Sequence, residues 1–125
     1  MYPDDLKYHK EHAWVRQDGT VGITHFAQEQ LGEIVFIEVP DAGAVVEAGE
    51  PFGEIESRKS VSDIYSPVSG KIKEVNSEVV DAPEIINEDP YGKGWVVKID
   101  MSDPGDLEGL LSATEYKGLV EGEES

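Results

Sequence analysis

The sequence predicts a mostly-β fold, a sandwich or a small barrel with helices at its edges. Many short β-prone segments alternate with turns rich in Gly, Pro and Asp along residues 14–99. A helical pattern occurs only in one short segment of the N-terminal half and after residue 103. This order of elements favours a β core to which helices are added.

Residues 1–12 are mostly polar and show no clear periodicity. Asp18-Gly19 then separates two β-prone runs, and this dipeptide predicts a hairpin because both turn residues tolerate positive φ. Thr24 is an N-cap for a helix over residues 25–31, which Gly32 ends. Phe26, Ala27 and Leu31 are expected on its inner face.

The central part predicts strands on both sides of a polar turn. Residues 33–39 have a continuous apolar centre, which indicates a strand buried on both faces. A short strand over 45–47 follows a turn at 40–43. A lysine-bearing hairpin is expected at about residues 53–70, with one strand over 52–57 and one long strand over 64–75. Gly70 within that second strand indicates a bulge or a close backbone approach.

The last third predicts one more strand and two helices. Val79 and Val80 are expected to pair weakly, and residues 84–93 to form a loop. In the last strand, over 95–99, we expect Trp95, Val97 and Ile99 to share one face. Two C-terminal helices are expected within about 103–121. The first begins at Asp103-Pro104 and the second at a capping box over 112–115. Tyr116, Leu119 and Val120 form the expected inner face of the second helix, and residues 121–125 a frayed acidic tail.

Composition limits the possible partners. The length of 125 residues fits one domain spanning 1–125. The formal net charge of −17 argues against nucleic acid and anionic lipid, and serves either solubility or attraction to positively charged proteins. No cysteine is present, so disulfides and thiolate metal sites are excluded. No apolar run approaches the ~20 residues of a membrane span, and residues 1–5 lack the features of a signal peptide. We therefore expect a cytoplasmic protein.

Conventional catalytic patterns are weak in this sequence. His9 and His12 are three residues apart, but no further ligand cluster accompanies them, so solvated or packed histidines are expected rather than a metal site. There is no nucleophile elbow and no phosphate-binding glycine loop. Lys59 at a hairpin tip is expected to be exposed to solvent, which makes it a poor base but leaves it accessible to another enzyme. We interpret Lys59 as the attachment point of a covalent cofactor; the alternative is an ordinary surface lysine.

Residues 56–70, ESRKSVSDIYSPVSG, resemble the glycine cleavage system H-protein family. Further matches in the same order are VGIT at 21–24, LGEIV at 31–35, NEDPYGKGW at 87–95 and Glu115-Tyr116. The resemblance covers nearly the whole chain. It implies a lipoyl-domain-like sandwich, or flattened barrel, of two antiparallel sheets with a short helix in the N-terminal half and two C-terminal helices.

The resemblance also implies a function. Lys59 would carry lipoic acid in amide linkage, placed there by a lipoyl-attaching enzyme. Glu56 and Asp63 would help that enzyme recognise the hairpin tip, or would contact the lipoyl arm on Lys59. Ordinary turn solvation is the alternative for both acids. The carrier would take an aminomethyl group from glycine decarboxylase to the aminomethyltransferase, and dihydrolipoyl dehydrogenase would reoxidise the arm. Such a protein is a carrier without turnover of its own, expected to be a monomer, and the family folds the loaded arm into a surface cleft.

Two positions depart from the family pattern. Ala13 stands where the family often has a glutamate that is thought to hold the loaded amine, and Glu11 or His12 is a possible substitute. Arg58 stands where a small apolar residue is usual. These departures keep open a lipoate carrier for another pathway, such as lipoyl relay or sulfur oxidation. An unmodified interaction module and a carrier with chemistry of its own are further alternatives. A biotin carrier is disfavoured, because methionines normally flank its lysine, whereas Arg58 and Ser60 stand here.

Overall fold

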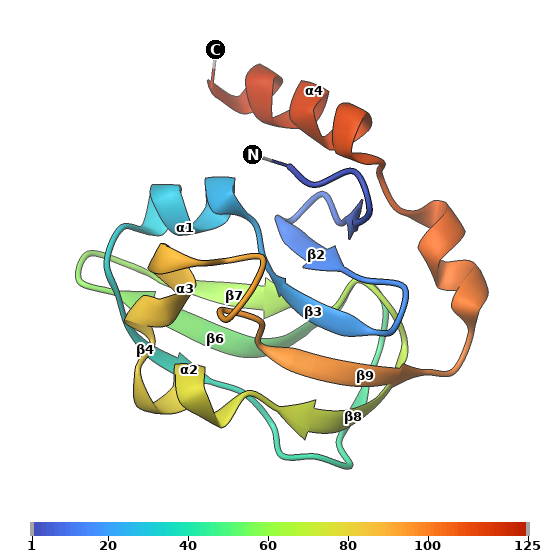
Figure 1. The fold of residues 1–125 in the computed structure, drawn as a ribbon, viewed down its shortest axis with the longest axis horizontal. Helices are drawn as coiled ribbons and strands as arrows, with labels where there is room; N and C mark the ends of the chain where they lie inside the picture. The colour runs from blue at the N-terminus through green and yellow to red at the C-terminus, as the bar shows by residue number, and fades with distance from the viewer. Residues whose placement is uncertain (1, 125) are drawn as a thin grey trace.

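The structure is a computed structural model that describes residues 2–124, and it contains two antiparallel β-sheets (Figure 1). The larger sheet has the strand order β1-β2-β3-β9-β8-β5, and the smaller sheet has the order β4-β6-β7. The strands are β1 (Lys7–Tyr8), β2 (Ala13–Val15), β3 (Thr20–Ile23), β4 (Ile34–Glu38), β5 (Val45–Val46), β6 (Pro51–Ser57), β7 (Val61–Tyr65), β8 (Gly70–Val75) and β9 (Val97–Met101). The helices are α1 (His25–Leu31), α2 (Ser77–Asp81), α3 (Glu84–Glu88), the 3-10 helix η1 (Pro104–Gly109) and α4 (Ala113–Glu124). The prediction of two antiparallel sheets with edge helices is confirmed.

The main core is built from both sheets. Every strand of the smaller sheet contributes buried isoleucines, namely Ile34 and Ile37 from β4, Ile55 from β6 and Ile64 from β7. The larger sheet contributes inward side chains that include Ile72 and Ile99. Glu54, Glu56 and Asp63, the sequence neighbours of Ile55 and Ile64, are exposed, as expected for a sheet with one solvated face.

A second apolar cluster joins the N-terminal segment to α4. Trp14 is fully buried in it, and its indole Nε1 donates a hydrogen bond to the Pro90 carbonyl oxygen at 3.0 Å. Tyr8 and Tyr116 stack with ring centroids 4.8 Å apart. Figure 1 shows α4 lying along the N-terminal segment at the top of the molecule. This cluster fixes the C-terminal helix next to the segment that leads into β2.

Several local predictions are confirmed. Asp18-Gly19 lies in the turn that connects β2 to β3, with a φ of +91° at Gly19. Helix α1 has the predicted bounds, and its N-cap Thr24 accepts a hydrogen bond from the Ala27 amide at 3.2 Å. The capping box forms at the start of α4: the Ser112 amide donates to the Glu115 carboxylate, and the Glu115 amide donates to the Ser112 hydroxyl.

The prediction of one long strand over residues 64–75 is wrong. The chain leaves the smaller sheet after β7, passes through a segment at 66–69, and joins the larger sheet as β8. Gly70 begins β8 where the backbones approach closely, because an added Cβ would lie 2.1 Å from the Asp100 carbonyl oxygen. The parity of Ile64, Val68 and Ile72 is nevertheless meaningful, since all three are buried.

The strand over residues 33–39 is not buried on both faces. A register shift between Ile34 and Phe36 places Val35 and Phe36 at the surface, 44% and 51% exposed. A bulge of this kind adds one residue to a strand and changes which face the following side chains occupy. A run of apolar residues cannot reveal such a bulge.

Other predictions of local structure need correction. Val79 and Val80 lie in helix α2, and part of the predicted loop over 84–93 is helix α3. The first C-terminal helix is the 3-10 helix η1. Trp95 precedes β9 and packs against the second cluster rather than sharing the inner face of Val97 and Ile99.

The two ends of the chain also differ from expectation. Residues 7–8 form the short strand β1, although this segment has no periodicity. The predicted frayed tail is helical through Glu124, and Ser125 lies outside the described residues. Within residues 2–124, no helix combines the length and apolar character needed to cross a membrane.

Candidate functional site

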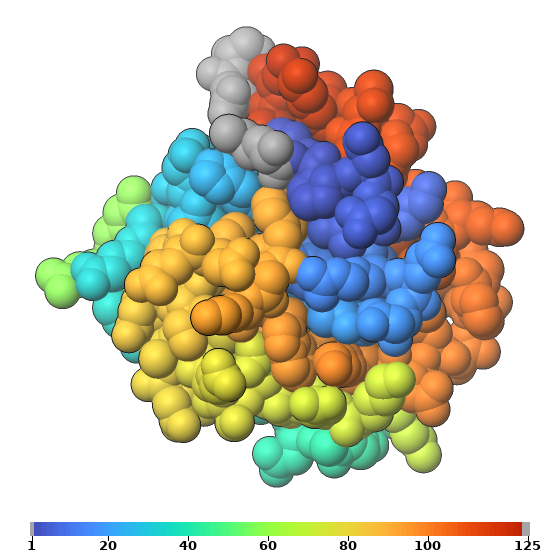
Figure 2. All heavy atoms as spheres, viewed as in Figure 1, coloured from blue at the N-terminus to red at the C-terminus, as the bar shows by residue number. Residues whose placement is uncertain are grey.

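Lys59 lies in the turn between β6 and β7, here called the tip (residues 57–61). The tip projects from the left edge of the molecule (Figure 2). Ser57, only 4% exposed, organises it: the Ser57 amide donates to the Ser60 carbonyl oxygen at 2.8 Å. The Ser57 hydroxyl accepts from the amides of Ser60 at 3.2 Å and Lys59 at 3.4 Å. One buried serine therefore fixes the backbone that presents Lys59.

Arg58, next to Lys59, forms an ion pair within the described residues, whereas the Lys59 amine does not. Arg58 Nε lies 2.6 Å from a carboxylate oxygen of Glu33, and the Arg58 amide donates to the Glu33 carbonyl oxygen at 3.3 Å. The Lys59 stem lies near the end of α1, because an added Cβ on Gly32 would be 3.7 Å from Lys59 Cε. Within residues 2–124, the Lys59 amine forms no hydrogen bond and no ion pair.

A surface cleft of about 480 Å³ begins beside the tip. Its lining residues Ser60–Tyr65 come from the tip and β7, and its opposite wall comes from α1 and the segment before β2. Apolar lining residues are Ala13, Ile23, Phe26, Ala27, Leu31, Ile55, Val61 and Ile64, and polar ones include Glu11, His12, Gln30, Ser60, Ser62, Asp63 and Glu123. The cleft is thus suited to an apolar chain with a polar end.

His12 connects the cleft to α1 and α4. It has a positive φ of +73°, which is uncommon for a residue with a side chain. Its Nδ1 is hydrogen-bonded to the Tyr116 hydroxyl at 2.7 Å, and its Nε2 lies 3.0 Å from a Glu123 carboxylate oxygen. Tyr116 is also hydrogen-bonded to Thr24 at 2.7 Å. Burial raises the pKa of Tyr116, so its hydroxyl keeps the proton that this network needs.

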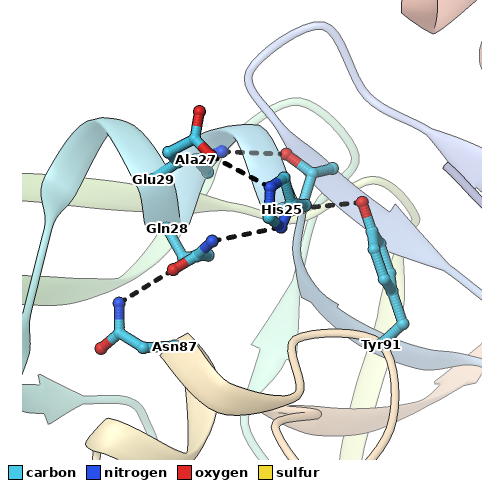
Figure 3. Close-up of polar contacts among 7 residues, drawn as sticks. His25, Ala27, Gln28, Glu29, Asn87 and Tyr91 are labelled. Carbon is cyan, nitrogen blue, oxygen red and sulfur yellow. Dashed lines mark hydrogen bonds and ion pairs between the residues drawn. The ribbon is translucent and has the colours of Figure 1, made fainter. Parts of the chain in front are cut away.

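Helix α1, which forms one wall of the cleft, is fixed by a polar network at its other side (Figure 3). The Asn87 side-chain amide donates to Gln28 at 3.0 Å and to the Gly32 carbonyl oxygen at 2.8 Å. Its oxygen accepts from the Ile34 amide at 2.9 Å. At the start of α1, the His25 amide donates to the Tyr91 hydroxyl at 2.9 Å, and burial raises the pKa of Tyr91 to about 12. The loop around 87–92 therefore supports the helix rather than contacting the tip.

The two acids predicted to flank Lys59 share the outer face of the smaller sheet but differ in their access to the cleft. Asp63 lines the cleft, whereas Glu56 is exposed on the outer face of the smaller sheet, opposite Phe36 and Val61. Glu11 and His12 line the cleft together with Ala13. Glu123 joins them from a segment that was predicted to be frayed. The helical spacing of Tyr116, Val120 and Glu123 places them on one face of α4, but their position beside His12 follows from tertiary packing.

The histidines do not assemble a metal site in the described part of the chain, which holds no group of three or more potential ligands. His9 instead stacks on Tyr65, with ring centroids 6.1 Å apart, and burial lowers its pKa. His25 contacts Glu29 within α1. The three histidines are thus used in packing and local hydrogen bonds.

Comparison with known proteins identifies the family. The model of the glycine cleavage H-protein family matches residues 6–123. A glycine cleavage system H protein of Carboxydothermus hydrogenoformans is 52% identical, covering 98% of this chain and 97% of its own. One from Anaeromyxobacter sp. (strain K) is 54% identical, covering 98% of each chain. A crystal structure of the glycine cleavage system H protein of Mycobacterium marinum superposes with a TM-score of 0.88 at 42% identity, covering 95% of this chain and 98% of that one. The chain therefore belongs to the glycine cleavage H-protein family.

Proposed function

We propose that this protein carries lipoic acid in amide linkage on Lys59 and shuttles the aminomethyl group of glycine between enzymes. Membership of the family supports the carrier role. The observation that carries the assignment to Lys59 is its exposed, unpaired amine on a hydrogen-bonded tip, next to a cleft with an apolar lining. A dithiolane on a flexible arm supplies a sulfur that can accept and release the one-carbon amine.

The residues around Lys59 fit such an arm. Ser57 fixes the tip backbone, and the ion pair between Arg58 and Glu33 leaves the lysine as the free cation of the tip within the described residues. Phe26, Ala27 and Leu31 offer apolar contacts along α1. A cleft of this kind excludes water from a group that would otherwise hydrolyse. The chain's own contribution is therefore to hold, orient and shelter the arm.

We infer that carboxylates of the cleft hold the protonated amine of the loaded arm. Ala13 offers no charge at the entry to β2, but Glu11 and Glu123 line the cleft on that side and Asp63 lines it on the side of β7. His12 positions Glu123 through its 3.0 Å contact. Replacing Glu123 by Gln should shorten the lifetime of the loaded arm several-fold. Glu121→Gln, two residues away on α4 and exposed, is the matched control.

This assignment makes the protein a carrier rather than an enzyme. Its partners would be a glycine decarboxylase that uses pyridoxal phosphate, a folate-dependent aminomethyltransferase, dihydrolipoyl dehydrogenase and a lipoyl-attaching enzyme. The arm raises the effective concentration of its sulfur at each active site. A monomer in the cytoplasm, with residues 1–125 folding as one domain, stays a prediction.

Reconstitution with a purified glycine decarboxylase tests the proposal. The lipoylated protein should support exchange of labelled bicarbonate into the carboxyl group of glycine, and Lys59→Arg should abolish it while Lys73→Arg retains it. Lipoylation without exchange would favour a carrier for another pathway. An unmodified Lys59 would favour an interaction module, and turnover without any partner enzyme would favour chemistry within the protein itself.

A further inference from the structure

The outer face of the smaller sheet carries an unusual arrangement of side chains. Phe36, Glu56 and Val61 lie opposite one another in one cross-strand row. Phe36 is 51% exposed and Val61 is 59% exposed. Glu38, Glu54 and Asp63 form the next row, farther from the tip. An apolar pair, Phe36 and Val61 on either side of Glu56, therefore lies between Lys59 and a row of three acids.

A groove of about 570 Å³ lies at this second row, and we call it the acidic groove. Glu38, Asp41, Glu54 and Asp63 contribute its carboxylates, and apolar lining comes from residues such as Val39 and Phe52. At Gly53 the backbone of β6 lies close to that of β4, because an added Cβ would lie 2.6 Å from the Glu38 carbonyl oxygen. The groove combines an apolar lining with negative charge, which suits the stem and head of a long basic side chain.

The carboxylates of the groove have no internal counter-charge. Within residues 2–124, none of these four acids forms an ion pair, and no lysine or arginine lines the groove. Like charges directly opposite each other on neighbouring strands destabilise a sheet. The arrangement of Glu38, Glu54 and Asp63 is therefore unfavourable in isolation and becomes favourable when a cation enters.

We propose that the acidic groove receives an arginine or lysine side chain of the lipoyl-attaching enzyme, while Phe36 and Val61 pack against an apolar part of the same surface. This inference rests on the proposed lipoylation of Lys59. An arginine could donate hydrogen bonds to two carboxylates at once through its planar fork, which would fix the direction of docking as well as its strength. The acidic groove is separate from the surface cleft beside the tip except at Asp63, which lines both.

The attaching enzyme is the partner that most needs such a surface. Eight of the ten basic residues in the chain are lysines, and the enzyme has to select one of them before any arm exists. Glu54 lies three residues before Ser57 on β6, so the groove is roughly 10 Å along the strand from the start of the tip. An enzyme docked on the groove and the apolar pair can place its active site only at Lys59.

The test compares two double variants that remove the same number of charges. Glu38→Gln with Glu54→Gln alters the groove, and Glu108→Gln with Glu121→Gln alters exposed acids on η1 and α4. Lipoylation by the purified attaching enzyme is followed by intact mass at low and at physiological salt. We expect kcat/KM of the groove variant to fall about tenfold at low salt and to lose most of its salt dependence. The control should stay within about twofold of the wild type.

A third variant separates the apolar contact from the charge. Phe36→Ala should raise KM at both salt concentrations and leave the salt dependence intact. Circular dichroism confirms that each variant is folded, and Asp41→Asn, in the turn after β4, replaces the double variant if that one does not fold.

The outcomes are distinguishable. Equal lipoylation of wild type, groove variant and control would overturn the inference while leaving the proposed function intact. An equal loss in the groove variant and the control would also overturn it, because net charge rather than the groove would then be responsible. A wild-type chain that is not lipoylated at all would remove the proposed function, and this inference with it.

Discussion

Two hairpin turns of the molecule, β2–β3 and β6–β7, are built in different ways. The β2–β3 turn is determined locally: Gly19 has a φ of +91°, and the Asp18 carboxylate accepts hydrogen bonds from the amide and hydroxyl of Thr20 at 2.9 and 2.8 Å. The β6–β7 tip depends on distant support, since Ser57 is buried and Glu33 holds Arg58. The first turn closes a hairpin, whereas the second holds one lysine away from every partner in the described chain. A rigid tip around a free amine is what a site of modification requires.

The largest effect is expected from Gly19→Ala in the β2–β3 turn. The new Cβ would lie 2.0 Å from the Ile99 carbonyl oxygen, at a backbone conformation that side chains rarely adopt. We expect a loss of ~3 kcal/mol in the free energy of unfolding, measured by urea denaturation. Gly43→Ala is the matched control, because Gly43 also has a positive φ but faces open space, and it should cost only ~1 kcal/mol. Equal losses in both variants would contradict the close approach to Ile99.

The support of the tip is tested next by Asn87→Ala. This change leaves the Gly32 carbonyl and the Ile34 amide without their partner on either side of Glu33. We expect a loss of ~2 kcal/mol in the free energy of unfolding and a slower lipoylation of Lys59. Asn87→Asp keeps the acceptor for Ile34 and should lose less. A variant that is destabilised but lipoylated at the normal rate would show that α1 does not position the tip.

A smaller effect is expected from Ser57→Ala within the tip. The hydroxyl of Ser57 accepts from two tip amides, and its loss should cost ~1 kcal/mol while loosening the backbone around Lys59. Ser60→Ala is the control, since the Ser60 hydroxyl has only a 3.5 Å contact with Ser57. Hydrogen exchange of the tip amides measures the loosening. Unchanged exchange in Ser57→Ala would mean that the serine does not organise the tip.

The smallest effect concerns Asp18 and its dependence on pH. The hydrogen bonds from Thr20, backbone first, lower the pKa of Asp18 in the folded state below its ordinary value of 3.8. The stabilisation is therefore present above pH ~4 and is lost as the pH falls through the folded pKa. Because the carboxylate is exposed, we expect only a few tenths of a kcal/mol. Asp18→Asn should be less stable than wild type at pH 7 and equal to it near pH 2, and the same difference at both pH values would contradict this origin.

The parts that sequence reasoning predicted are those with a local cause. The Asp18-Gly19 hairpin, helix α1 between Thr24 and Gly32, and the capping box at Ser112 each depend on neighbouring residues. The errors arise where a distant contact decides. The change of sheet before Gly70 depends on β9, and Val79 lies in a helix although its residue type favours strands.

The candidate site divides in the same way. Lys59 at a turn follows from the local pattern and from the resemblance to a family. The position of Glu56 outside the cleft follows from strand register, and the contribution of Glu123 follows from packing of α4 against residues more than 100 positions earlier, such as His12. Neither arrangement can be derived from spacing along the chain.

The attachment of lipoic acid to Lys59 is the central claim, and mass spectrometry tests it most directly. The protein is purified from its native host, its intact mass is measured, and its peptides are mapped. We predict one lipoyl increment on the peptide that contains Lys59, absent in Lys59→Arg and retained in Lys73→Arg. An unmodified Lys59, in a host that lipoylates its other lipoate-dependent proteins, would contradict the account.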